Sequence, residues 1–101
     1  MIDRKTILES AIECVTGHRV EDHGRPEDSF KIIANLWEAY TGHEYSAQDV
    51  AIMLGLLKVG RIASGQGSLD NYIDLAGYAA CAGEMYARAK EAYTNDPHTD
   101  G

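Results

Sequence analysis

The segment from Val50 to Ile62 is the feature of the sequence that most restricts how the chain can fold. Its only charged residues, Lys58 and Arg61, lie toward its C-terminal end, and apolar residues cover nearly the whole circumference of the helix that it predicts. A helix that is apolar all round is buried all round. Because the other helices of so short a chain can barely hide it, we expect a second subunit to cover one of its sides.

Hydrophobic periodicity predicts four helices, which cover about residues 4–16, 27–40, 46–62 and 69–93. Their ends carry typical start signals: Pro26 suits a first helical turn, and Ser46 with Asp49 forms an S-x-x-D start. The sequence shows neither strand alternation nor an internal repeat. We therefore predict an all-α fold, a four-helix bundle completed by homo-oligomerisation, with residues 1–94 as a single helical domain and residues 95–101 as a disordered tail.

The charge of the chain argues against one class of partner. With 9 Lys and Arg against 16 Asp and Glu, the net charge is −7, so the chain lacks a basic footprint for duplex nucleic acid. A small phosphate ligand needs only two or three local cations. Neither a membrane span nor a signal peptide is expected. Cys14 and Cys81 are far apart in the sequence, and we expect buried free thiols in a cytoplasmic protein.

Four charged residues are expected to meet between the last two helices. Asp70 and Asp74 lie four residues apart and share a helix face, and Lys58 and Arg61 share a face of the preceding helix. Because the connection between these helices is short, they should run antiparallel and bring the two pairs together. The cluster is either an interhelical salt bridge or a phosphate site, in which the cations bind directly or the acids hold a divalent ion.

A second candidate lies in the loop before the second helix, where His23 and Arg25 flank Gly24. A helix N-terminus can receive an anion, so this loop is expected to form one wall of a phosphate pocket. Tyr78 is of a type that stacks on bases, although aromatic residues at helical spacing are more often core residues. None of the histidines pairs at i+3 or i+4 with another ligand, which disfavours zinc. No nucleophile has the surroundings of a catalytic site, so no catalytic residue is assigned.

These motifs occur in one order: a His-Gly-x-Pro loop, then Phe…Trp…Tyr-x-Gly, then Asp-Val-Ala…Lys-x-x-Arg, then Asp…Asp-Leu-Ala-Gly-Tyr. In this order they resemble a family of small phage and prophage proteins of unknown function, akin to those described as nucleotide-modification-associated. The resemblance covers about Arg19 to Ala80. It rests on His23, Gly24, Pro26, Phe30, Trp37, Tyr40, Gly42, Asp49, Val50, Lys58, Arg61, Asp70, Asp74, Gly77 and Tyr78.

The helical pattern is also similar to that of the all-α (MazG-like) nucleoside triphosphate pyrophosphatases. There, an E-x-x-E pair and an E-x-x-D pair on two helices hold magnesium. This sequence offers only Asn35-x-x-Glu38 and Asn71-x-x-Asp74, the latter beside Asp70. Half of the metal-binding carboxylates are thus missing or replaced. The resemblance implies a site of nucleotide size, in which any metal would be Mg²⁺ on Asp70 and Asp74.

Three functions of different classes are consistent with these features. The favoured one is a phage-type protein that binds or sequesters a nucleotide or a nucleotide signal, for example in counter-defence, through His23, Gly24, Arg25, Lys58, Arg61 and Tyr78. The second is a degenerate Mg²⁺-dependent pyrophosphatase that uses Asp70, Asp74, Asp49 and Glu38. The third is a structural or interaction oligomer, whose charged cluster only fixes the register of the helices.

Overall fold

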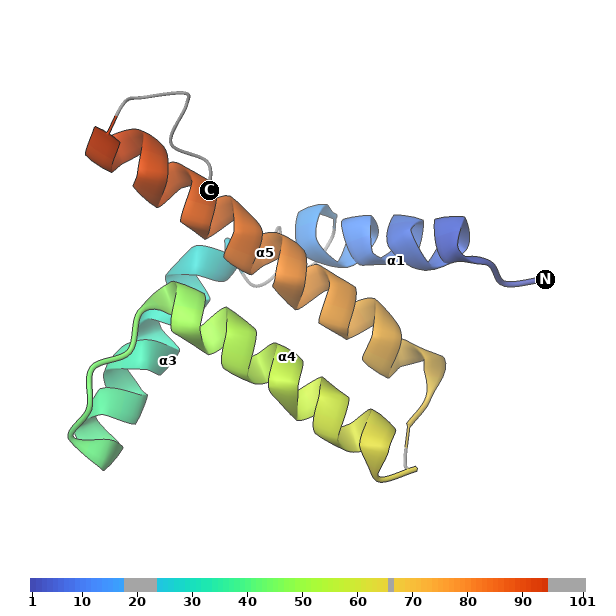
Figure 1. Cartoon of the computed structure of the whole chain (residues 1–101), viewed down its shortest axis with the longest axis horizontal. Helices are drawn as coiled ribbons and strands as arrows, with labels where there is room; N and C mark the ends of the chain where they lie inside the picture. Colours follow the sequence, from blue (N-terminus) through green and yellow to red (C-terminus); the bar gives the residue numbers. More distant parts are fainter. Residues whose placement is uncertain (18–23, 66, 95–101) are drawn as a thin grey trace.

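The described part of the chain consists of helices. The computed structural model describes residues 1–17, 24–65 and 67–94, and no strand occurs in these ranges. The helices are α1 (Arg4–Thr16), α3 (Pro26–Thr41), α4 (Ala47–Ala63) and α5 (Leu69–Thr94) (Figure 1). The predicted all-α class is confirmed, and the helix bounds agree closely with the predicted ones. The predicted tail, residues 95–101, lies outside the described residues.

Local sequence signals account for where the helices begin and end. The Asp3 carboxylate caps α1 by accepting the Thr6 N–H at 2.9 Å, and these hydrogen bonds from Thr6 hold the pKa of Asp3 below its usual value. The predicted start of α4 is confirmed as a full capping box, in which the Ser46 hydroxyl accepts the Asp49 N–H and the Asp49 carboxylate accepts the Ser46 N–H, both at 2.9 Å. Gly42 ends α3 in the left-handed region (φ 82°), which favours glycine.

Two helices form the centre of the molecule. Figure 1 shows α4 and α5 running side by side in opposite directions, as the short connection between them predicts. Close contact is possible because small residues face the neighbouring helix: a Cβ on Gly55 would lie 3.4 Å from Leu75, and a Cβ on Gly77 would lie 3.2 Å from Val15. The helix α1 packs against α5, and α3 packs mainly against α4. The result is an open arrangement in which α1 and α3 pack on the α4–α5 hairpin.

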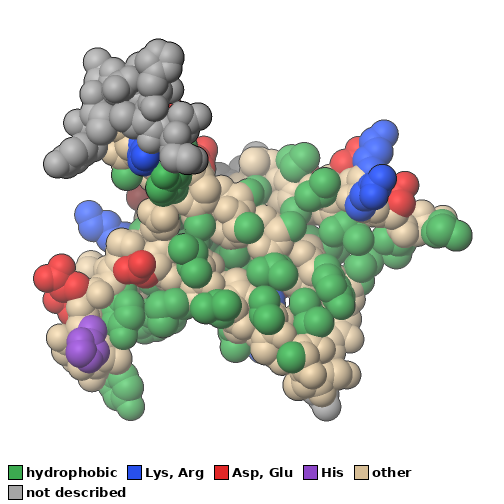
Figure 2. All heavy atoms as spheres, in the orientation of Figure 1, with side chains coloured by type: hydrophobic (Ala, Val, Ile, Leu, Met, Phe, Trp, Pro, Cys, Tyr) green, Lys and Arg blue, Asp and Glu red, His purple; other side chains and the backbone are tan. Residues whose placement is uncertain are grey.

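The core is small and is made mostly of small side chains. Its buried members are Phe30, Ala34, Val50, Ala51, Cys81 and Ala82. Only one side of α4 is covered, because Val50, Ala51 and Gly55 are buried, whereas Ile52 and Leu56 are 49% and 61% exposed. The described helices of one chain thus leave one side of α4 exposed (Figure 2). The expectation that a second subunit covers this side stays a prediction.

Candidate functional site

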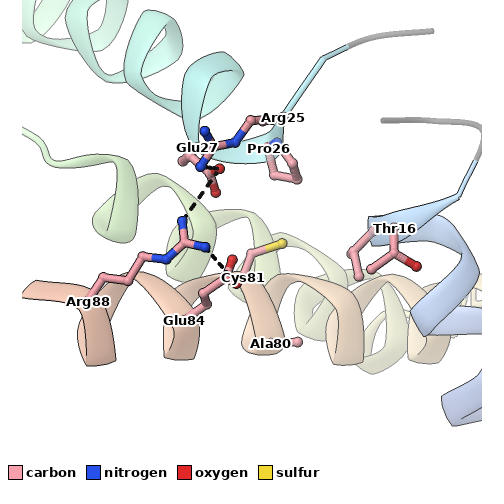
Figure 3. A pocket seen from close by; sticks show the side chains of 9 residues that line it. Thr16, Arg25, Pro26, Glu27, Ala80, Cys81, Glu84 and Arg88 are labelled. Atoms are coloured by element: carbon pink, nitrogen blue, oxygen red, sulfur yellow. Dashed lines mark hydrogen bonds and ion pairs between the residues drawn. The ribbon is translucent and has the colours of Figure 1, made fainter. Parts of the chain in front are cut away.

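A hollow opens where three of the described helices approach one another. It is a cleft of about 580 Å³ between the end of α1, the start of α3 and the middle of α5 (Figure 3). Cavities of a few hundred cubic ångströms are the usual size of small-molecule sites. The lining residues are Val15, Thr16, Arg25, Pro26, Glu27, Ala80, Cys81, Glu84 and Arg88.

Two guanidinium groups meet on one carboxylate at this cleft. The Glu27 Oε1 atom forms an ion pair with Arg25 and lies 3.8 Å from Arg88 Nη1, while Arg88 Nη2 lies 3.2 Å from Glu84 Oε2 (Figure 3). Glu27 is mostly covered, with 22% of its side chain exposed, but Arg25 and Arg88 are 58% and 56% exposed. The carboxylate thus holds two guanidinium groups that remain open to solvent and to a ligand.

The start of α3 adds a partial positive charge beside the two guanidinium groups. Gly24, in the left-handed region (φ 80°), leads into Arg25, which occupies the N-cap position without a side-chain hydrogen bond to cap the helix. Pro26 follows at the first helical position, as predicted. An N-terminus carries the positive end of the helix dipole and unpaired N–H groups. An anion in the cleft would therefore meet two guanidinium groups and the open end of a helix.

Cys81, which lines the cleft, has an unreactive thiol. Cys81 is a free, buried thiol, which agrees with the expectation from its apolar neighbours. Burial raises the pKa of the Cys81 thiol, and the nearby carboxylates of Glu84 and Glu27 raise it further. A thiol that stays protonated is a poor nucleophile. The cysteine of the cleft is therefore not poised for covalent chemistry.

The second predicted cluster, between α4 and α5, is present in part. Lys58 Nζ lies 3.0 Å from Asp74 Oδ2, with 14% and 20% of these side chains exposed, so the predicted meeting of the two helices' charges is confirmed for this pair. Arg61 is exposed in the last turn of α4 and forms no ion pair with any residue in the described ranges. Asp70 is exposed in the first turn of α5.

Acidic residues line another, smaller hollow beside this pair. It measures about 410 Å³ between α1 and α5, and its lining residues are Ser10, Glu13, Cys14, Asp70, Ile73 and Asp74. Within the described ranges, no three His, Cys, Asp or Glu side chains are close enough to hold a metal ion. Asp49, at the opposite end of the hairpin, is engaged in the capping box of α4.

The residues predicted to form one phosphate site therefore lie in separate places. Arg25 lines the cleft and Gly24 directly precedes it in the chain. Asp74, in contrast, lies two turns away from Cys81 on α5, about 10 Å along the helix axis. Tyr78 packs against Phe30, with ring centroids 6.0 Å apart, beside the core. His23 lies outside the described residues. Sequence reasoning does not find Arg88, whose only local signal is its i,i+4 pairing with Glu84.

These features define a small all-α protein with an arginine-lined cleft. The chain belongs to the family described as a domain of unknown function (DUF6378), whose pattern matches residues 6–86. This agrees with the predicted kinship to small phage proteins of unknown function, because the chain is similar to the Gene 55 proteins of Mycobacterium phages L5 and D29.

The similarity to these relatives extends over most of the chain. Identity is 37% over 93 residues for the phage L5 protein and 36% over 87 residues for the phage D29 protein, which covers 91% and 86% of this chain. The chain spans 60% and 58% of the lengths of these relatives. No solved structure matches the chain. None of the helices in the described ranges has the length and hydropathy needed to cross a bilayer.

Proposed function

We propose that this chain binds a nucleotide or another phosphorylated small molecule in the cleft between α1, α3 and α5. The observation that carries the proposal is the meeting of Arg25 and Arg88 on Glu27 at the open start of α3. Guanidinium groups present several N–H donors in a fixed plane that matches two phosphate oxygens. Glu27 would orient the two groups, and their unused N–H donors would bind the phosphate.

The charge balance of the cleft sets an expectation about the ligand. Glu27 and Glu84 offset the two guanidinium charges, so a ligand with low negative charge is favoured over one with high charge. We therefore expect nucleoside monophosphates and cyclic nucleotides to bind better than triphosphates without metal. In a protein of phage type, such binding would withdraw a nucleotide or a nucleotide signal from the host.

The cations assigned to the phosphate differ from those that the sequence favours. Lys58 already has Asp74 as a partner, and Arg61 lies at the far end of α4. Arg88 takes their place as the second cation beside Arg25. We assign no role in binding to Tyr78, since its ring packs on Phe30. His23 directly precedes Gly24 in the sequence and is kept as a candidate donor.

The alternative, an Mg²⁺-dependent pyrophosphatase, has a specific feature in its favour. Glu13, Asp70 and Asp74 line one hollow, and carboxylates are the usual protein ligands of Mg²⁺. One difficulty is that no three of the described acidic, histidine or cysteine side chains lie close enough together to hold a metal ion. Another is that Lys58 Nζ lies 3.0 Å from Asp74 Oδ2. A metal ion there would have to displace or repel the ammonium group.

A thermal-shift screen of mono-, di-, tri- and cyclic nucleotides, with and without Mg²⁺, tests the proposal. A ligand at about ten times its dissociation constant adds about 1.4 kcal/mol to the free energy of unfolding, which shifts the midpoint of a domain this small by roughly 5–10 °C. We expect such a shift without Mg²⁺, and we expect Arg25→Gln and Arg88→Gln to abolish it. Lys31→Gln is the matched control, since it removes one cation from the exposed surface of α3 outside the cleft.

Three other outcomes would change the assignment. A flat response across all nucleotides would overturn the proposal. A ligand shift that survives Arg25→Gln and Arg88→Gln but is lost in Lys58→Met would place the site at the α4–α5 pair. Release of pyrophosphate that requires Mg²⁺ and is lost in Asp70→Asn would favour the pyrophosphatase.

A further inference from the structure

Arg88 is shared between two carboxylates on different helices. Its Nη1 atom lies 3.8 Å from Glu27 Oε1 on α3, and its Nη2 atom lies 3.2 Å from Glu84 Oε2, one turn earlier on α5 (Figure 3). Both carboxylates belong to residues that line the cleft. A phosphate bound to Arg88 therefore comes close to both carboxylates, and it competes with them for any N–H donor that they already use.

The two carboxylates differ in how easily a ligand displaces them. Glu27 is 22% exposed and also pairs with Arg25, so the loss of its contacts would leave a largely covered charge without compensation, which is costly. Glu84 is 54% exposed, and Arg88 is its one ion-pair partner in the described ranges. Water can replace that partner, because exposed ion pairs contribute little to stability. We therefore expect the phosphate to displace Glu84 from Arg88 Nη2 and to leave Glu27 in place.

Displacement does not carry the charge of Glu84 away from the ligand. Residues four apart on a helix share a face, with their Cβ atoms about 6 Å apart, so a phosphate held by Arg88 stays beside the Glu84 carboxylate. The ionised side chains that line the cleft, two arginines and two glutamates, have no net charge. The start of α3 adds roughly half a positive charge, which Asp28 in its first turn partly offsets. This balance suits a ligand with one negative charge, and each further charge adds repulsion from Glu84.

We propose that Glu84 is a specificity-determining residue, which makes the cleft prefer a singly charged phosphodiester to a doubly charged phosphomonoester. This role of Glu84 rests on the proposed function and names the class of phosphate that the same cleft takes. A phosphomonoester carries close to two charges at neutral pH, because its second pKa is about 6, whereas a diester has one ionisable oxygen and carries one charge. The diester still offers two free oxygens to the guanidinium groups.

The uncharged lining of the cleft acts in the same direction as its charge. Val15, Pro26 and Ala80 line it from α1, α3 and α5, next to the charged groups (Figure 3). Small-molecule sites usually combine such apolar walls with a few polar groups that fix the ligand. A phosphate with two organic substituents presents more apolar surface to these residues than a phosphate with one.

A matched pair of ligands isolates the effect of charge. Each of the four common nucleoside 5′-monophosphates is compared with its methyl phosphodiester, which differs from it by one methyl group and one negative charge. At about pH 7.5 we expect the unmodified chain to bind the diester about three- to tenfold more tightly, since one extra charge near a solvated carboxylate changes an affinity by about this factor. Isothermal titration calorimetry measures both dissociation constants.

Glu84→Gln removes the charge and keeps the size of the side chain. We expect it to reduce the preference for the diester by about three- to tenfold, mainly because the monoester binds more tightly. The added methyl group is the same for both proteins, so the change in the ratio reports charge. Glu44→Gln is the matched control, because Glu44 is an exposed acid beyond the C-terminal end of α3 and does not line the cleft. Its ratio should equal that of the unmodified chain.

The results separate the role of Glu84 from the proposed function. If the unmodified chain binds these nucleotides but prefers the monoester, or if Glu84→Gln keeps the same ratio, the role of Glu84 is wrong and the proposed function stands. Loss of both ligands in a Glu84→Gln chain that keeps its helices by circular dichroism would show that Glu84 only holds Arg88 in place, which also overturns this role. A chain that binds neither ligand of any pair, and no nucleotide of the thermal-shift screen, overturns the proposed function and the role of Glu84 together.

Discussion

The side chains of Arg25 and Arg88 meet at Glu27 because α5 carries Arg88 past the start of α3. Their meeting depends on the packing of two helices that are distant in the sequence, so no local pattern predicts it. The pair of Lys58 and Asp74 is different. A short connection forces α4 and α5 to be antiparallel neighbours, and the helical repeat then places these two residues opposite each other. Sequence reasoning thus finds the second contact and does not find the first.

At the same scale, Cys81 should make stability depend on pH in the alkaline range. Its pKa is raised in the folded state by burial, with Glu84 and Glu27 adding to the effect. As the pH rises past the ordinary thiol value of about 8.5, the unfolded chain loses its proton first, so the free energy of unfolding falls. Urea unfolding of the reduced protein between about pH 7 and pH 10 measures this effect.

Two cysteine variants separate this effect from other alkaline titrations. Cys81→Ala should show a shallower fall in the free energy of unfolding over that range than the unmodified chain. Cys14→Ala, which removes the other free thiol, should keep the steeper fall. Equal slopes for the unmodified chain and Cys81→Ala would contradict the assignment of the effect to Cys81.

At the scale of the helices, the bounds follow closely from cap residues, glycines and proline. These signals act over three or four residues, which is why the sequence alone predicts them well. Which side of a helix is covered is another matter. The sequence shows that α4 is apolar all round, but only the packing shows that Val50, Ala51 and Gly55 face inward while Ile52 and Leu56 face outward.

The capping box of α4 yields a prediction about a single hydroxyl. Ser46→Ala removes the acceptor of the Asp49 N–H and should lower the free energy of unfolding by about 1 kcal/mol. Ser46→Asn, which can still accept that hydrogen bond, should cost clearly less. Chemical denaturation of the three proteins at one fixed concentration measures the difference. Similar losses for the two variants would show that the hydroxyl does not act as a cap.

For the molecule as a whole, α1 is the least supported part of the architecture. It packs against α5 alone among its main contacts, and Ala11 is its one buried residue. The α4–α5 hairpin, in contrast, holds most of the core. The sequence predicts four helices of the right length, but it does not predict this unequal attachment, because the apolar stripe of residues 4–16 resembles that of residues 27–40.

Unequal attachment should appear as unequal protection from hydrogen exchange. We expect the amides of α1 to exchange about tenfold or more faster than those in the middle of α4, because α1 can detach without disrupting the hairpin. Hydrogen exchange followed by mass spectrometry resolves the two helices as separate peptides. Comparable protection of α1 and α4 would show that the chain opens only as one unit.

The small side chains of the core have a consequence for the temperature dependence of stability. Val50 is the largest side chain that is fully buried, and larger side chains packed on the core, such as Trp37 and Leu54, are only partly buried. The heat capacity change of unfolding grows with the apolar area exposed. For a chain of this length we expect a change near the low end of about 1.2–1.5 kcal/mol/K, which gives a flat stability curve. Cooling should therefore change the free energy of unfolding only gradually.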